Sequence, residues 1–180
     1  MAANLLFLSI SKNLRWTVMA NTPLKEGDRV PNFTLKGLDE RGNEFEFKFE
    51  NFSKGKVLIY FYPKDNTPGC TTEACDFRDN LNLFKNFGIT VIGISPDSLK
   101  SHRKFREKHN LNFILLSNPD REVAEMFGAY GEKKSYGKIT KGIIRSTFYI
   151  EDGVIKKAWR NVRAKGHVAR VMKELGLLEG

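Results

Sequence analysis

The sequence is poor in cysteine, and the two cysteines that it has lie close together. Cys70 and Cys75 are the only cysteines in 180 residues, which excludes a disulfide-rich secreted scaffold and fits a reducing compartment better. Two cysteines placed for structure alone would gain more stability by closing a long loop. Their position in one short segment, directly after an apolar run, therefore suggests redox chemistry.

Long apolar runs are also absent, and none approaches the length of a membrane span. The run over residues 5–10 has no positive charge before it, so it is a poor match to a secretory signal. Residues 1–23 are basic and contain no acidic residue, which partly fits an organelle transit peptide, but Met19 could also be the true start. We predict a poorly ordered extension over 1–23 and one domain over 24–180. We expect a cytoplasmic protein without membrane contact, or an organellar one if the extension is a transit peptide.

Acidic residues are fewer than basic ones: 21 Asp and Glu stand against 30 Lys and Arg, a net charge of +9. Such a charge fits either a nucleic-acid partner or a lysine-rich solvated surface. The densest basic patch lies near the end of the chain, over 156–173, and no nucleic-acid motif accompanies it. We therefore expect no nucleic-acid partner. A basic binding protein with incidental cysteines remains an alternative.

Hydrophobic periodicity predicts an α/β fold. Continuous apolar runs over 57–62 and 90–95 are typical of strands buried on both faces, and the Asp-Gly turn after 147–150 indicates a hairpin with 154–159. Because of that hairpin we predict a central mixed β-sheet with helices on both faces. The polar stretch 130–140 is interpreted as a loop. The other predicted strands cover 31–35, 45–49 and 113–116. The predicted helices cover 70–87, 98–108, 121–127 and 167–175, and Asp97 or Ser98 can cap the second of them.

The spacing of the two cysteines has a mechanical consequence. On an ideal helix, positions i and i+5 differ by a rise of about 7.5 Å and a rotation of about 140°, so their Cα atoms are roughly 8.6 Å apart. A disulfide requires less than about 7 Å. If the segment is helical, Cys70 and Cys75 can bond only after the helix partly unwinds, over about 70–79.

The position of Cys70 favours reactivity. It follows a strand and a turn and begins a helix, where backbone N–H groups and the helix dipole favour the nucleophilic thiolate. A cation would help further, and Arg78 and Arg145 are candidates. The hydroxyl of Thr67 could reach a ligand over the helix N-terminus, or could cap the helix. The turn before Cys70 argues against the alternative that both cysteines are small buried hydrophobes.

A thiolate with a second thiol nearby fits a two-step oxidation. An oxidant converts Cys70 to a sulfenic acid, and Cys75 condenses with it to a disulfide, which stops overoxidation. An external dithiol then reduces the disulfide. A general thiol–disulfide oxidoreductase is the competing enzyme class, but it would be expected to carry Cys-x-x-Cys, which is absent.

The segment also resembles a known family. Pro63, Thr67 and Cys70 match the peroxiredoxin motif Pro-x-x-x-Thr-x-x-Cys, and the stretch 60–75 looks like the bacterioferritin comigratory protein, or peroxiredoxin Q, subfamily. The segments 27–35 and 145–148 share the resemblance, which covers about residues 24–175. The extension before Leu24 is the main departure.

The resemblance implies a thioredoxin-like fold and a thiol-dependent peroxidase that reduces hydrogen peroxide and organic hydroperoxides. Cys70 would be the peroxidatic and Cys75 the resolving cysteine, Thr67 and Arg145 would hydrogen-bond the peroxide, and Pro63, with Pro68, would shape the loop and shield the thiolate. Thioredoxin or a similar dithiol would be the reductant.

The resemblance also implies that no metal, haem or flavin cofactor is needed. The three histidines agree, because their spacing is not that of metal ligands. We expect these three residues, His102, His109 and His167, to be single surface residues.

We expect the protein to be a monomer, with a dimer as the alternative.

Overall fold

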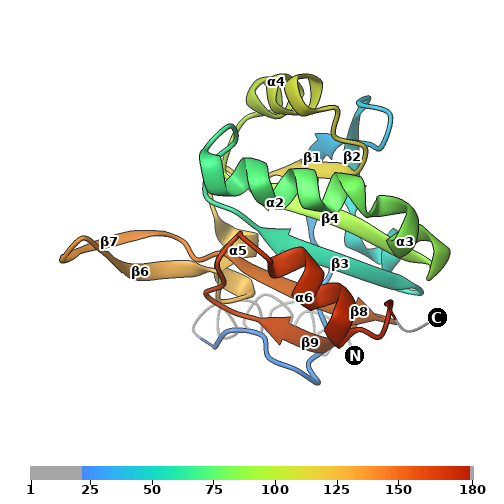
Figure 1. Cartoon of the computed structure of the whole chain (residues 1–180). Helices are drawn as coiled ribbons and strands as arrows, with labels where there is room; N and C mark the ends of the chain where they lie inside the picture. Colours follow the sequence, from blue (N-terminus) through green and yellow to red (C-terminus); the bar gives the residue numbers. More distant parts are fainter. Residues whose placement is uncertain (1–21, 179–180) are drawn as a thin grey trace, which may run out of the picture.

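The structure, a computed structural model that describes residues 22–178, is built on a seven-stranded sheet (Figure 1). The strand order is β2-β1-β5-β4-β3-β8-β9. The three middle strands β3, β4 and β5 run parallel, and β8 joins β3 in antiparallel fashion. The predicted mixed sheet is therefore confirmed. Its strands are β1 (Thr34–Leu38), β2 (Glu44–Lys48), β3 (Lys56–Phe61), β4 (Ile89–Ser95), β5 (Ile114–Ser117), β8 (Ser146–Glu151) and β9 (Val154–Trp159).

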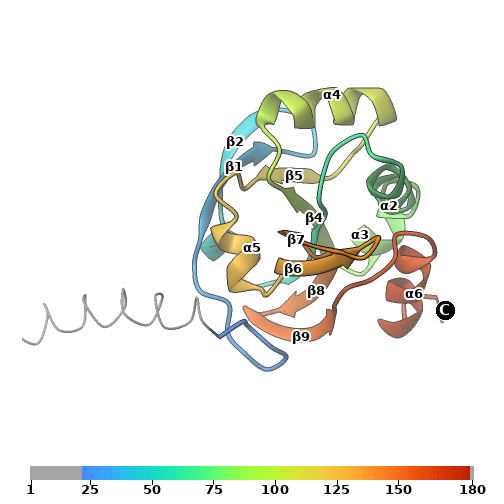
Figure 2. The same ribbon diagram turned by 90° about the vertical axis from the view of Figure 1, so that its left-hand side faces the viewer.

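Helices cover both faces of this sheet, as predicted. Figure 2 shows α5 (Glu122–Met126) on one side and α2 (Pro68–Asp79), α3 (Leu81–Asn86) and α6 (His167–Glu174) on the other. The first side also carries the 3-10 helix η1 (Phe49–Phe52), and α4 (Leu99–His109) contributes Phe105 to the core beneath α2.

Strand β3 shows why two cores form. Successive side chains of a strand point to opposite faces, so Val57, Ile59 and Phe61 enter the core under α5. Leu58 and Tyr60 enter the core under α2 and α6. A strand buried on both faces must be apolar throughout, which is the run read from the sequence.

The predicted helix over 70–87 is two helices. Asn80 separates α2 from α3, and both its backbone N–H and its side-chain Nδ2 donate to Asp76 O, at 3.2 and 2.8 Å. An asparagine amide that bonds the backbone in this way competes with the regular helical ladder. The single continuous helix was therefore a wrong prediction at this residue.

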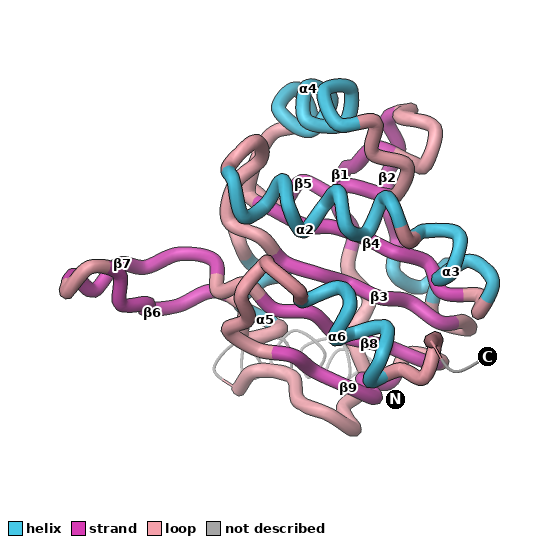
Figure 3. The backbone as a smooth tube through the Cα atoms, viewed as in Figure 1, coloured by secondary structure: helices cyan, strands magenta, loops and turns pink. Residues whose placement is uncertain are grey.

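Residues 130–140 are not a loop. They belong to the hairpin of β6 (Tyr130–Ser135) and β7 (Lys138–Ile143), a separate two-stranded sheet that projects from the domain (Figure 3). Tyr136 and Gly137 form its turn with positive φ values of 52° and 76°, as a type I′ hairpin turn requires. The alternation of apolar and polar residues that marks a strand is missing because the arm is largely exposed and has little core to face.

Other local signals are confirmed. Asp152 and Gly153 have positive φ and form the two-residue turn between β8 and β9. Ser98 caps α4, because its Oγ accepts a hydrogen bond from Ser101 N at 3.2 Å. The first predicted strand begins later than expected, at Thr34.

The predicted extension over 1–23 lies outside the described residues except for its last two. From Leu24 onward the chain is part of the fold: Leu24 is buried, and its N–H donates to Met126 O at 3.0 Å. Within residues 22–178, no helix combines the length and apolar character needed to cross a membrane.

Candidate active site

Cys70 lies in the first turn of α2, immediately after the loop that leaves β3. Pro68 starts the helix, where its missing N–H costs nothing and its fixed φ suits the first turn. The thiol is buried, with 2% of the residue exposed, and it packs in the core under α2. The expectation that the turn would keep it exposed was wrong, because α2 lies directly on the sheet.

Arg145 is the cation that reaches Cys70. Its Nη2 lies 3.3 Å from Cys70 Sγ, and its Nη1 donates to Glu73 Oε1 at 2.7 Å. The sheet explains this meeting, since Phe61 at the end of β3 pairs with Ser146 at the start of β8. Arg145 therefore stands beside the loop that leads to Cys70, although 75 positions separate them in the chain.

Arg78, the other candidate cation, turns away from the thiol. Its Nη1 donates to the carbonyl of His109 at 2.6 Å, and its Nη2 contacts Asp79 at 3.0 Å. It therefore links α2 to the end of α4 and does not assist Cys70.

Glu73 is a site residue that the sequence analysis missed. It is fully buried, and burial raises its pKa to about 7, although the charge of Arg145 lowers it. Burial also works against the charge on Arg145, but Glu73 and Cys70 outweigh it and raise the pKa of the guanidinium. The signal was available: Glu73 is three residues after Cys70, so both lie on one helix face.

Glu73 and Arg145 leave one polar atom unused. Glu73 Oε2 is buried and has no hydrogen-bond partner within residues 22–178. The carboxyl group therefore contacts the guanidinium through a single oxygen, Oε1.

Thr67 and Pro63 shape the loop before Cys70. Thr67 occupies the N-cap position of α2, but its hydroxyl makes no capping bond and instead donates to Lys64 O at 2.8 Å. The capping alternative is therefore excluded for its side chain. Pro63 is half-buried and lies two residues after the end of β3.

Cys75 lies on the same unbroken helix as Cys70. It is half-buried, and both residues carry free thiols. The helical spacing of roughly 8.6 Å between Cα atoms therefore applies, beyond the reach of a disulfide.

The prediction of surface histidines fails for His102 and His167, which are buried, while His109 is half-buried. His167 Nε2 lies 2.7 Å from Thr147 Oγ1. Burial lowers the pKa of His167 to about 4, with Arg170 and Arg145 adding to the effect, so this ring is neutral at pH 7. The partner of His167, Thr147, lies on β8, 20 residues away in the sequence, so the spacing of the histidines could not have predicted this contact.

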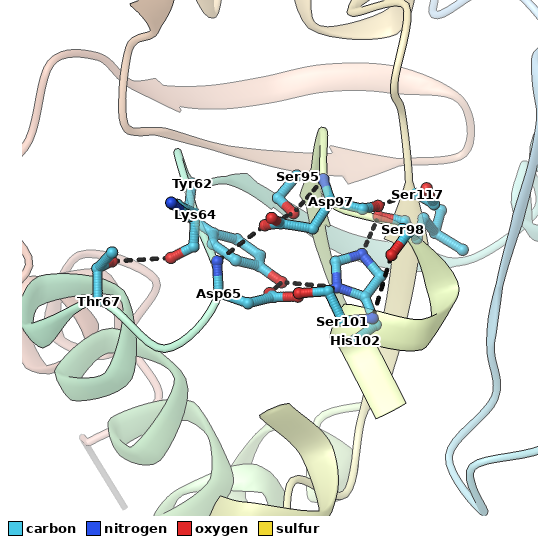
Figure 4. Close-up of polar contacts among 11 residues, drawn as sticks. Tyr62, Lys64, Asp65, Thr67, Ser95, Asp97, Ser98, Ser101, His102 and Ser117 are labelled. Carbon is cyan, nitrogen blue, oxygen red and sulfur yellow. Dashed lines mark hydrogen bonds and ion pairs between the residues drawn. The ribbon is translucent and has the colours of Figure 1, made fainter. Parts of the chain in front are cut away.

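His102 belongs to a polar network around the loop. Its Nδ1 lies 2.7 Å from Asp65 Oδ2, and Figure 4 shows this pair next to Tyr62, Asp97 and Ser101. Donor atoms of Asp65, Asp97 and His102 lie within 4.8 Å of one another, a spacing that suits a metal ion. Both oxygens of Asp65 and both nitrogens of His102 already contact protein partners, however, so the network is a hydrogen-bonded one.

The sequence and the fold have counterparts among known proteins. The model of the AhpC/TSA family matches residues 26–158. Peroxiredoxin Bcp of Bacillus subtilis is 45% identical over 150 residues, which are 83% of this chain and 93% of that protein.

Two solved structures agree. A cysteine-to-serine mutant of PrxQ from Xylella fastidiosa superposes with a TM-score of 0.77 and 34% identity, covering 86% of this chain and 96% of that one. The bacterioferritin comigratory protein of Xanthomonas campestris gives a TM-score of 0.68 and 38% identity, covering 78% and 89%. The thioredoxin-like fold is thus established. The chain belongs to the AhpC/TSA family, in its Bcp or peroxiredoxin Q group, and is a peroxidase of the oxidoreductase class.

Proposed function

We propose that Cys70 is the peroxidatic cysteine. Its thiolate attacks one oxygen of the peroxide, the O–O bond breaks, and the other oxygen leaves as water or an alcohol after taking up a proton. Cys70 is then a sulfenic acid. The contact of Arg145 Nη2 with Cys70 Sγ carries this proposal, because a fixed positive charge there stabilises both the thiolate and the charge that develops on the breaking bond.

Cys75 would act as the resolving cysteine. Its thiol attacks the Cys70 sulfenic acid, water leaves, and a disulfide forms within the chain. Since both residues occupy α2, the first turns of that helix must open for this step. A dithiol protein such as thioredoxin then exchanges with the disulfide, becomes oxidised and returns both cysteines to thiols.

The remaining residues would prepare the substrate site. Thr67 is the N-cap residue of α2. Its hydroxyl donates to Lys64 O, and the hydroxyl oxygen can still accept a hydrogen bond. We assign it to binding the peroxide together with Arg145, and Pro63 to shaping the loop.

We include organic hydroperoxides among the substrates, because the Xanthomonas protein is described for its alkyl peroxide reduction activity. The proposal further comprises a cytoplasmic monomer of one domain from residue 24, without a cofactor, nucleic acid or membrane partner.

Replacing each cysteine tests the proposal. Cys70→Ser should abolish thioredoxin-dependent peroxide consumption because the attacking sulfur is lost. Cys75→Ser should consume one equivalent of peroxide and stop as a sulfenic acid, which dimedone labelling and mass spectrometry would detect. Full activity in Cys70→Ser would overturn the assignment.

Arg145 and Arg78 form a matched pair of variants. Removing one preorganised donor to a developing charge typically lowers a rate 10²–10³-fold, so Arg145→Met should slow single-turnover oxidation of Cys70 by about that factor. Arg78→Met also removes one positive charge, from α2 itself, without touching the thiol and should change the rate less than about threefold. Equal losses in both variants would contradict the role of Arg145.

Hydrogen exchange should report the opening of α2. In the dithiol form, the amides of 71–79 should be protected as a helix, and in the Cys70–Cys75 disulfide they should exchange faster, because the spacing forbids the bond on an intact helix. Helix α6 serves as the internal reference and should not change. Equal protection of 71–79 in both states would refute the argument from spacing.

Glu73 should make stability depend on pH. Its pKa rises from 4.5 to about 7 on folding, so the folded protein binds the proton more tightly, and the resulting stability is lost as pH rises from about 4.5 to 7. Relative to the wild type, Glu73→Gln should gain of the order of 3 kcal/mol in unfolding free energy between pH 4.5 and 8. Urea denaturation of the reduced proteins measures it, and a difference independent of pH would show that Glu73 does not titrate there.

A further inference from the structure

Asp65, in the loop between β3 and α2, is the centre of a buried cluster of hydrogen bonds. Its Oδ1 accepts from Tyr62 OH at 2.6 Å, and its Oδ2 accepts from Ser101 Oγ at 2.8 Å. The same Oδ2 lies 2.7 Å from His102 Nδ1 (Figure 4). Only 1% of the Asp65 side chain is exposed and none of that of His102. One carboxylate thus joins the active-site loop to α4.

The contacts of His102 tie it to two other elements. Its Nε2 lies 2.9 Å from the carbonyl oxygen of Leu116 on β5, and a carbonyl can only accept, so Nε2 donates this hydrogen bond. Its Nδ1 lies 2.7 Å from Asp65 Oδ2, the oxygen that also accepts from Ser101 Oγ. The ring and the carboxyl group therefore form one buried, hydrogen-bonded pair, and removing either partner leaves the other in the interior without it.

The backbone of Asp65 is held as well. Its N–H donates to Asp97 Oδ2 at 2.8 Å, and Ser95 Oγ donates to the same oxygen at 2.7 Å. Asp97 lies two residues after the end of β4, and its carbonyl accepts from Ser117 Oγ on β5. Asp65 is therefore fixed from the ends of two central strands as well as from α4.

This attachment stops at Asp65. The next residue, Asn66, is exposed and has a left-handed φ of 61°, and the hydroxyl of Thr67 bonds only back to Lys64 O within the same loop. On α2, Cys70 and Glu73 share the guanidinium of Arg145. The boundary between a fixed segment and one able to move thus falls between 65 and 66.

We propose that Asp65 and His102 are positioning residues, whose buried pair holds the start of the active-site loop so that α2 closes with Cys70 against Arg145. The pair touches neither peroxide nor thiol. It fixes the point in the loop about which α2 opens for disulfide formation and about which it closes again. This inference rests on the proposed roles of Cys70 and Cys75.

The two half-reactions of the full-length reduced protein separate this role from simple stability. Quenched-flow mixing with hydrogen peroxide, thiol alkylation and mass spectrometry give the rate of Cys70 oxidation and the rate of disulfide formation. In Asp65→Asn and in His102→Asn, oxidation should slow at least tenfold because the closed helix is less populated. Disulfide formation should be unchanged or faster, because the open form is more populated.

The double variant Asp65→Asn/His102→Asn should lose no more oxidation rate than the worse single variant, since both residues act through one pair. Ile155→Ala is the control for stability, because it removes a fully buried side chain from β9 in the other core. It should destabilise the fold while leaving both rates within twofold.

Oxidation rates within twofold of the wild type in both Asp65→Asn and His102→Asn would overturn the inference, as would an equal slowing in Ile155→Ala. If the charge-removing variants do not fold, Ser101→Ala and Tyr62→Phe each remove one donor to Asp65 and should slow oxidation about threefold. No effect in either would also overturn it. Peroxide consumption by Cys70→Ser keeps the two failures apart. Activity in that variant would refute the role of Cys70, whereas an inactive Cys70→Ser together with wild-type rates in the Asp65 and His102 variants would refute only the positioning role.

Discussion

The site depends on one guanidinium held between two side chains of a single helix. Arg145 contacts the sulfur of Cys70 with one nitrogen and the carboxylate of Glu73 with the other. Glu73 is fully buried and would be costly as a lone charge, so the arginine compensates the carboxylate while the carboxylate orients the arginine. Without this bridge the thiol would be a small buried hydrophobe, the alternative that the sequence left open. With it, the same buried position becomes one where a thiolate has a charged partner.

The sheet explains how the bridge can be rigid. Strand β3 ends at Phe61, two residues before Pro63 in the active-site loop, and β8 begins directly after Arg145. These two strands are paired with Phe61 opposite Ser146, so the positions of the arginine and the loop are set by backbone hydrogen bonds in the middle of a seven-stranded sheet. Groups on strand ends are positioned more accurately than groups on free loops. The contact between Arg145 and Cys70 thus has a structural basis in strand register.

The loop before α2 joins a fixed segment to a helix whose first turn must open. The chemistry proposed for Cys70 needs a closed first turn of α2, whereas a bond to Cys75 needs that turn open, because both thiols lie on one helix. The fixed part and the part that must open are consecutive segments of the chain. Up to Asp65 the loop is tied to buried partners, whereas Asn66 is exposed and the hydroxyl of Thr67 bonds only to Lys64 O within the loop.

Much of the fold followed from the sequence, because buried strands and capped helices leave local patterns. The runs 57–62 and 90–95, the Ser98 cap and the Asp-Gly turn all correspond to the structure. The pattern failed where burial did not impose it, as in the exposed hairpin of β6 and β7, and where one side chain broke a helix, as at Asn80.

The motif around Cys70 and the spacing to Cys75 were determined by the sequence alone, since both lie within a single helix. Which cation serves the thiol was decided only by the tertiary structure: Arg78 is nearer in the chain, but the pairing of β3 with β8 brings in Arg145. The burial of Glu73 and His102 likewise arises from residues distant in sequence, and contacts of that kind exist only once the sheet has formed.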